Sequence, residues 1–266
     1  TGNFITMDAR ASGPFESANY LALYLAPILT LAIGNTLYLF RGRPNFEAYI
    51  WLILTLIMAL AFWETQSYAG YIAVFSGLAF LTFAYHGVSM KKKSGVALGL
   101  LVVFMVVLGT QMNTEKFQQF LDFDARTSSS VRVEVYEIAT TLLRENTISG
   151  IGLGQFETEY QLNAARILGH APYEWVMIHP HNLLLAFWLN TGAAGVIAIV
   201  WLLGLAFVGG DVNVKKGVWT GLLKRVKKGD TGAHFNYHLA GLSMLVTVLV
   251  HGLFDTPFFK NDLAYE

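Results

Sequence analysis

Residues 183–208 read LLLAFWLNTGAAGVIAIVWLLGLAFV, a stretch without one charged side chain. At 1.5 Å of rise per residue, a helix over this segment is long enough to cross about 30 Å of hydrocarbon. Five further segments are similarly apolar, and they cover residues 20–40, 46–63, 68–85, 95–110 and 239–256. The sequence therefore predicts an all-α, polytopic transmembrane helix bundle with about six spans, of which the fourth is short.

The composition agrees with a membrane protein. Hydrophobic residues make up 54% of the chain and charged residues only 14%, whereas soluble domains carry about 25% charged residues. Lys and Arg number 18, as do Asp and Glu, so no basic field indicates nucleic acid as a partner. The absence of cysteine excludes disulfides, thiolate metal sites and a cysteine nucleophile. We interpret residues 1–266 as a single membrane domain from a longer protein.

The charges divide unequally between the two sides of the membrane. If the spans alternate, the loops at 41–45, 86–94 and 209–238 share one side and hold eleven of the eighteen basic residues. By the positive-inside rule that side is cytoplasmic. The protein would then be a multi-pass protein of the inner membrane, and its large loop at 111–182 would face the periplasm or exterior. This loop is acidic, with nine Asp or Glu against five Lys or Arg.

Within this loop the sequence predicts one amphipathic helix over about residues 130–145. Hydroxyl side chains at 127–130 are suited to capping it, and apolar residues follow at helical spacing. Arg132 falls in the predicted first turn, where the helix dipole disfavours a cation. Its guanidinium and nearby backbone donors indicate an anion site; a surface contact with Glu134 or Tyr136 is the structural alternative. Glycines at 150, 152 and 154 predict an irregular stretch from there to Asn182.

His181 and Asn182 stand at the mouth of the fifth span, so an imidazole that titrates near neutral pH is expected at the membrane surface. The structural alternative is an interfacial histidine beside a helix-capping Asn182. Asp255 follows the sixth span, where a carboxylate is costly unless it is paired or hydrated. Pairing with Lys260, or exposure among lipid head groups, is the alternative to a role in binding. The histidines at 170, 179 and 181 also raise the possibility of a metal site, but no HExxH motif accompanies them.

These residues resemble the O-antigen ligase and O-antigen polymerase superfamily of membrane glycosyltransferases. His181-Asn182, nine residues and then Gly192-Ala193-Ala194-Gly195 are similar to the family's His-[Asn/Ser/Gln]-x9-Gly-x-x-[Gly/Thr/Tyr] signature. Further similar stretches are residues 10–19, 128–132, 150–156 and 251–262. The resemblance covers nearly all of this chain, but only about the C-terminal half of a family member, which typically has around a dozen spans.

The resemblance implies a GT-C-like enzyme that transfers an undecaprenyl-pyrophosphate-linked glycan to an acceptor hydroxyl at the periplasmic face. The acceptor would be a lipid A core or another glycan or lipid, and no cofactor or metal is implied. By this resemblance His181 would be the general base and Arg132 would bind the donor pyrophosphate. Asn182 and Asp255 are further candidates for substrate binding because of their positions at the outer ends of the spans. The family often has a Ser-Arg pair after the second of these spans, where this chain has Ser67-Tyr68. Arg10 or Tyr68 would then replace the second arginine.

Three other functions remain as alternatives at this point. A polymerase of O-antigen or exopolysaccharide repeat units shares the signature. A transporter would require ionisable residues in the middle of spans and paired broken helices, whereas these spans are nearly free of charge. A non-catalytic membrane scaffold would be consistent with Tyr68 at the position of the second arginine.

Overall fold

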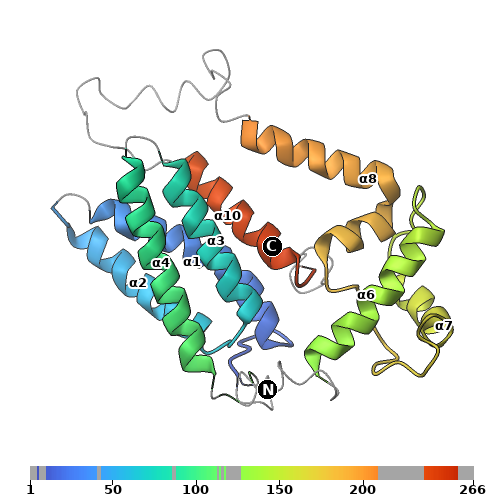
Figure 1. The fold of residues 1–266 in the computed structure, drawn as a ribbon. Helices are drawn as coiled ribbons and strands as arrows, with labels where there is room; N and C mark the ends of the chain where they lie inside the picture. Colours follow the sequence, from blue (N-terminus) through green and yellow to red (C-terminus); the bar gives the residue numbers. More distant parts are fainter. Residues whose placement is uncertain are drawn as a thin grey trace.

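The computed structural model describes residues 10–40, 43–85, 88–112, 127–208 and 237–256, together with residues 5, 114 and 117. The regular elements in these parts of the chain are α-helices, and among the described residues extended backbone pairs only in an isolated bridge between Ile5 and Ala11. Figure 1 shows two groups of helices, with α1–α4 and α10 side by side in one and α6, α7 and the start of α8 in the other. The predicted all-α class is confirmed.

The bundle comprises α1 (Ala18–Leu39), α2 (Phe46–Trp63), α3 (Tyr68–Ala84), α4 (Met90–Gln111) and α10 (Tyr237–Gly252). A helix is present at each of the six predicted apolar segments, and α1, α2, α4 and α8 are long and apolar enough to cross a membrane. The expectation of a short fourth segment was wrong, because α4 has 22 residues. It begins at Met90, so the three lysines that we assigned to the preceding loop lie in the helix.

Small and hydroxylic residues allow α1, α3 and α10 to pack closely. A Cβ atom on Gly77 of α3 would overlap Thr247 of α10 and would lie 2.9 Å from the Ser243 carbonyl oxygen. The Thr30 and Thr247 hydroxyl oxygens are 3.1 Å apart, so α1 and α10 share a buried hydrogen bond. Such contacts are typical of helices in lipid, where close packing replaces the hydrophobic driving force.

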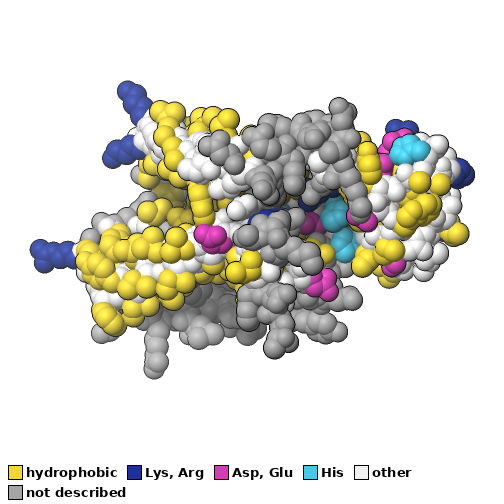
Figure 2. Space-filling model, turned by 90° about the horizontal axis from the view of Figure 1, so that it is seen from below, with side chains coloured by type: hydrophobic (Ala, Val, Ile, Leu, Met, Phe, Trp, Pro, Cys, Tyr) yellow, Lys and Arg dark blue, Asp and Glu magenta, His cyan; other side chains and the backbone are white. Residues whose placement is uncertain are grey.

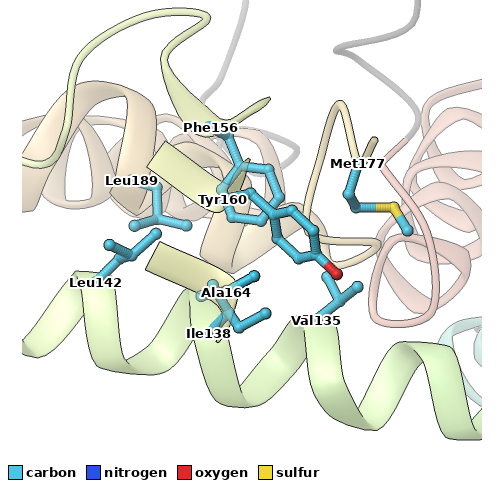
Figure 3. Packing of buried hydrophobic residues seen from close by; sticks show 9 residues of the cluster. Val135, Ile138, Leu142, Phe156, Tyr160, Ala164, Met177 and Leu189 are labelled. Carbon is cyan, nitrogen blue, oxygen red and sulfur yellow. The ribbon is translucent and has the colours of Figure 1, made fainter. Parts of the chain in front are cut away.

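The second group of helices is a lobe built on α6 (Ser128–Glu145) and α7 (Phe156–Leu168). Thr127 is the N-cap of α6 and forms a capping box with Ser130, which confirms the expected cap. Figure 3 shows the core of the lobe, in which side chains of α6 face those of α7 and α8. Its fully buried members include Val135, Ile138, Leu142, Phe156, Tyr160 and Leu189.

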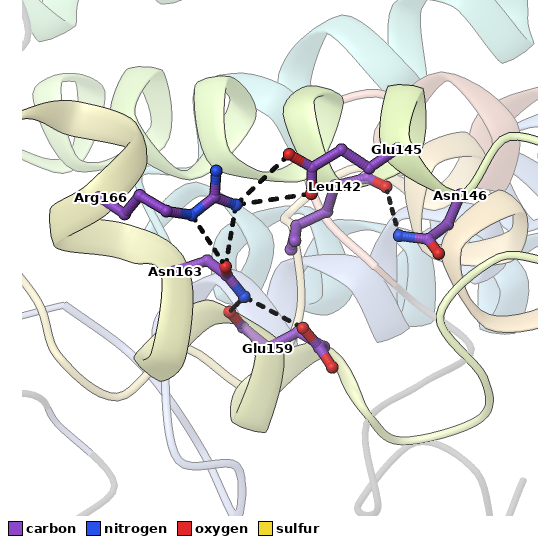
Figure 4. Close-up of polar contacts among 6 residues, drawn as sticks. All are labelled: Leu142, Glu145, Asn146, Glu159, Asn163 and Arg166. Carbon is purple, nitrogen blue, oxygen red and sulfur yellow. Dashed lines mark hydrogen bonds and ion pairs between the residues drawn. The ribbon is translucent and has the colours of Figure 1, made fainter.

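Helix α7 was missing from the prediction, which treated residues 150–182 as irregular. Phe156, Tyr160 and Ala164 recur at intervals of four and are all buried, which is helical spacing. Figure 4 shows how polar contacts join the exposed sides of the two helices, with Arg166 of α7 3.3 Å from the Glu145 carboxylate of α6. The glycines that surround the helix concealed this short periodic segment.

Helix α8 (Leu183–Val208) is not the single continuous span that the sequence predicts. Gly192 has φ 68° and ψ −171°, so two helical segments meet there at a kink. The Ala193 N–H donates to the Ile148 carbonyl oxygen at 3.0 Å, and the Leu189 carbonyl oxygen accepts from the Ile151 N–H at 2.7 Å. In an unbroken helix Ala193 would donate to Leu189. The turn before α7 therefore satisfies both groups that the kink releases.

Candidate active site

His181 is held at the junction of the bundle and the lobe by three elements. Its backbone φ is 49°, a left-handed conformation that is uncommon outside glycine. The Tyr136 hydroxyl of α6 donates to the His181 carbonyl oxygen at 3.0 Å. Asn182 accepts from the Leu185 N–H at 3.1 Å and donates to the Leu253 carbonyl oxygen at 3.0 Å. Asn182 thus caps α8 and ties this helix to the end of α10.

The imidazole of His181 contacts a buried carboxylate. Its Nδ1 lies 3.2 Å from Oδ1 of Asp255, whose side chain is 3% exposed, whereas the His181 side chain is 22% exposed. The same Oδ1 accepts from the Thr256 N–H at 2.9 Å. Gly252 allows this approach, because a Cβ there would lie 2.9 Å from Leu183. Exposure of Asp255 among lipid head groups, one of our alternatives, was wrong; Lys260 lies outside the described residues.

This geometry selects the tautomer of His181. An ionised carboxylate only accepts hydrogen bonds, so Nδ1 carries the hydrogen that Asp255 receives. Nε2 of the neutral ring is then left with a lone pair that can accept a proton. The same division between the two ring nitrogens operates in histidine–carboxylate pairs of hydrolases. The site has the arrangement of a general base and a carboxylate that orients it.

Arg132 lies on α6 one helical turn before Tyr136. Because α6 begins at Ser128, Arg132 is its fifth residue, and the expectation that it lies in the first turn was wrong. Burial raises the pKa of Tyr136, while the charge of Arg132 lowers it and that of Asp255 raises it further. The charges of Arg132 and of Asp255, the carboxylate that contacts His181, thus both affect the pKa of the Tyr136 hydroxyl. Tyr136 stays protonated at neutral pH and remains a donor to His181.

Arg132 makes no hydrogen bond or ion pair with another residue that the structure describes, and it is half-buried. The alternative partner Glu134 points elsewhere, because residues two apart do not share a helix face. Its buried carboxylate accepts from the Tyr173 N–H at 2.8 Å and lies 4.0 Å from Nδ1 of His170. Glu134 holds the segment before His181, and the Arg132 guanidinium keeps its donors for other contacts.

Arg10 and Tyr68 lie at the turn between α2 and α3, where the family often has an arginine. Nε of Arg10 donates to the Thr65 carbonyl oxygen at 2.8 Å, and a terminal nitrogen donates to Asn19 at 2.9 Å. The Tyr68 ring packs edge-on against Phe117. The N-terminal segment thus folds over this turn, with Arg10 buried. In Figure 2, histidine, acidic and basic side chains gather near the middle of the face seen from below, between the bundle and the lobe.

His170 and His179, the other two histidines of the possible metal site, contact different groups. The His179 and His181 rings lie 5.6 Å apart in an edge-on arrangement. His170 is exposed, and its Nδ1 lies 2.9 Å from the Ala171 carbonyl oxygen. Within the described ranges, no three His, Asp or Glu side chains are grouped so that they could hold a metal ion.

Sequence reasoning missed Tyr136 as a site residue and the contact between Asp255 and His181. Tyr136 was detectable, because it follows Arg132 by four positions and therefore shares its helix face. The pairing of Asp255 with His181 joins residues 74 positions apart, and no local pattern predicts such a contact.

The four long apolar helices indicate a multi-pass membrane protein. A model of the O-antigen ligase family matches residues 53–200. The match covers more than half of the chain, which therefore belongs to the O-antigen ligase family. It includes Arg132, His181 and the kink at Gly192, and membership indicates a membrane enzyme that processes glycans. None of the curated proteins matches the chain.

Proposed function

We propose that this protein transfers a glycan from undecaprenyl pyrophosphate to an acceptor hydroxyl, as an O-antigen ligase. The observation that carries this proposal is the His181–Asp255 pair beside the half-buried Arg132. A base and a pyrophosphate-binding cation are the two groups that such a transfer needs, because the leaving group is already good. The acceptor is the hydroxyl of a lipid A core or of another glycan or lipid.

His181 removes the acceptor proton in the proposed reaction. The hydroxyl oxygen forms a bond to the anomeric carbon while the bond from that carbon to the pyrophosphate oxygen breaks. The hydroxyl proton passes to Nε2 of His181, and the electron pair of the broken bond leaves with undecaprenyl pyrophosphate. Asp255 stabilises the imidazolium that forms, so its role is to position and support His181. General-base help of this kind contributes about 10²–10⁴-fold.

Arg132 binds the pyrophosphate of the donor. The planar guanidinium can donate two parallel hydrogen bonds to phosphate oxygens, and these bonds strengthen as charge builds on the leaving group. Arg10 is the second proposed contact with the donor, and Tyr68 is the alternative donor of a hydrogen bond at the same turn. Hydrogen bonds to Thr65 and Asn19 hold the Arg10 guanidinium in place.

Orientation follows from the distribution of basic residues. Lys91 and Lys92 are exposed in the first turn of α4, which lies beside the start of α10, whereas Asp255 follows the end of α10. By the positive-inside rule, the lysine end is cytoplasmic and the His181 end faces the periplasm of an inner membrane. Lipid-linked donors would reach His181 from the outer leaflet.

Complementation tests the proposal in cells. The full-length protein is expressed in a ligase-null strain and in a polymerase-null strain that each make the matching lipid-linked glycan. We expect surface polysaccharide to return in the ligase-null strain, and His181→Ala to abolish it at equal membrane abundance. Rescue of only the polymerase-null strain would indicate that the protein polymerises repeat units and is not a ligase. Full rescue by His181→Ala would remove the base assignment.

A further inference from the structure

A cavity of about 310 Å³ lies at the end of the bundle opposite to His181. It is formed where α1 and α3 end and where α4 and α10 begin. Apolar residues such as Leu81, Val96 and Leu239 line most of it, with Tyr38 and Tyr85. Helix α10 has 16 residues and is about 24 Å long. Because Leu239 is near its start and Asp255 follows its end, the cavity is separate from the proposed active site.

A buried lysine forms part of the cavity wall. Lys93 is 9% exposed, and its Nζ donates to the Phe83 carbonyl oxygen at 2.5 Å. Among the described residues, no carboxylate forms an ion pair with Lys93. An ammonium has three N–H donors, and a buried charge is costly unless it is paired. The cavity therefore presents a positive charge, and among the residues that the structure describes only the Phe83 carbonyl oxygen is hydrogen-bonded to it.

Capping of α3 explains one of the three donors. Phe83 is in the last turn of α3, where carbonyl groups lack helical partners and a lysine commonly contacts them. This role does not account for the charge or for the cavity beside it. Lys91 and Lys92 add two exposed cations in the first turn of α4, where the helix dipole disfavours cations and favours an anion.

We propose that this cavity binds one anionic phospholipid. The phosphate of the lipid contacts the Lys93 ammonium, and part of one acyl chain fills the apolar space beside Val96. The volume lies at the lower end of the range for small-molecule sites, about 300–1,000 Å³. Basic pockets between transmembrane helices are suited to anionic head groups, and this pocket combines a buried cation with an apolar wall.

Lipid retention by the wild-type protein provides the first test. The full-length protein is reconstituted in bilayers of equal parts phosphatidylglycerol and phosphatidylcholine, extracted into mild detergent, and examined by native mass spectrometry. We expect one retained phosphatidylglycerol to predominate over phosphatidylcholine. Equal retention of the two lipids would overturn the proposal. Displacement of the retained lipid by inorganic phosphate would also overturn it, since the site would then recognise an anion without its chain.

Two pairs of variants separate the charge from the cavity. Lys93→Gln should lower the preference for phosphatidylglycerol by about fivefold or more, and Lys93→Arg should keep it. Val96→Trp should reduce retention by filling the cavity, whereas Val102→Trp should leave it unchanged. Val96 and Val102 are both about half exposed on α4, but only Val96 lines this cavity. Unchanged retention with both Lys93→Gln and Val96→Trp would contradict the proposed site.

Discussion

His181 has a left-handed backbone conformation, which is unfavourable for a residue other than glycine, and the contacts around it maintain this conformation. A left-handed conformation costs a residue other than glycine about 1–2 kcal/mol. The Tyr136 hydroxyl holds the His181 carbonyl group, and Asp255 holds the imidazole ring. The following residue, Asn182, is held by the hydrogen bond that its side chain accepts from Leu185. Local strain of this kind is often retained at functional sites because it sets the direction of a side chain. We infer that it directs the imidazole of His181 toward the acceptor.

Asp255→Asn tests whether the carboxylate sets the tautomer of His181. The amide removes the negative charge and can donate to Nδ1, which would leave the hydrogen on Nε2. We expect kcat to fall by about 10²–10⁴-fold with little change in the KM for the donor. Glu159→Gln is the control for loss of a carboxylate, because Glu159 contacts Asn163 within its own helix, α7, and none of the residues around His181. Equal losses in both variants would indicate a general structural effect.

Arg132→Lys tests the proposed contact between Arg132 and the donor pyrophosphate. Lysine keeps the charge but cannot form two parallel hydrogen bonds. Loss of a hydrogen bond between charged groups costs about 1.5–3 kcal/mol, so we expect the donor to bind roughly tenfold more weakly or worse. Titration with the lipid-linked donor measures this change. An unchanged donor affinity would exclude Arg132 from the binding site.

At the scale of elements, the kink in α8 joins the lobe to the bundle. The backbone at Gly150 packs directly against α8 at the kink. A Cβ on Gly150 would lie 2.8 Å from the Trp188 carbonyl oxygen and 2.9 Å from the backbone nitrogen of Gly192. The Trp188 indole N–H also donates to the Thr147 carbonyl oxygen at 2.7 Å. Broken helices occur at membrane depth only where other groups satisfy the freed backbone. The spaced glycines thus have a structural reason apart from any catalytic chemistry.

Gly192→Ala should destabilise this junction. The backbone of Gly192 is in a region that is essentially restricted to glycine, and a Cβ would overlap the Ile148 carbonyl oxygen. We expect a loss of about 3 kcal/mol or more in the free energy of unfolding. Gly204→Ala, with open space around the added Cβ, should cost nothing. Unfolding in mild detergent, followed by tryptophan fluorescence, compares the two; equal stability would contradict the proposed role of the kink.

At the scale of the whole molecule, apolar patterning predicted the position of every helix in the bundle. Such patterning is strong because long apolar segments have few alternatives in lipid. The N-cap at Thr127 and the apolar face of α6 were also predictable from local sequence. In contrast, α7 was missed because its apolar pattern is short. The kink was missed because an apolar sequence does not show that Gly192 has non-helical dihedral angles.

The residues of the candidate site could be proposed one by one from the sequence, but their arrangement could not. His181 and Arg132 were identified from their positions and from the family resemblance. The partner of Asp255 depends on how the ends of α8 and α10 meet, where Gly252 packs on Leu183. The burial of Arg10 depends on the fold of the N-terminal segment over Thr65. Both are tertiary contacts between distant segments, which a single sequence does not specify.

The absence of cysteine allows a direct test of orientation. Leu162 on α7 and Ser94 near the start of α4 are both exposed, so each can be changed to cysteine without disturbing a core. We expect a membrane-impermeant maleimide to label Leu162→Cys in cells with a permeable outer membrane. Ser94→Cys should react only after the inner membrane is opened. The reverse pattern would invert the proposed topology.

The most direct measurement is the single-turnover rate of glycan transfer by the full-length protein in proteoliposomes, with lipid-linked donor and a lipid acceptor. His181→Ala should slow transfer by about 10²–10⁴-fold while donor binding is retained. His238→Ala should keep the wild-type rate, because this exposed histidine lies at the other end of α10. Transfer by His181→Ala within a few-fold of the wild-type rate would contradict the assignment of His181 as the base.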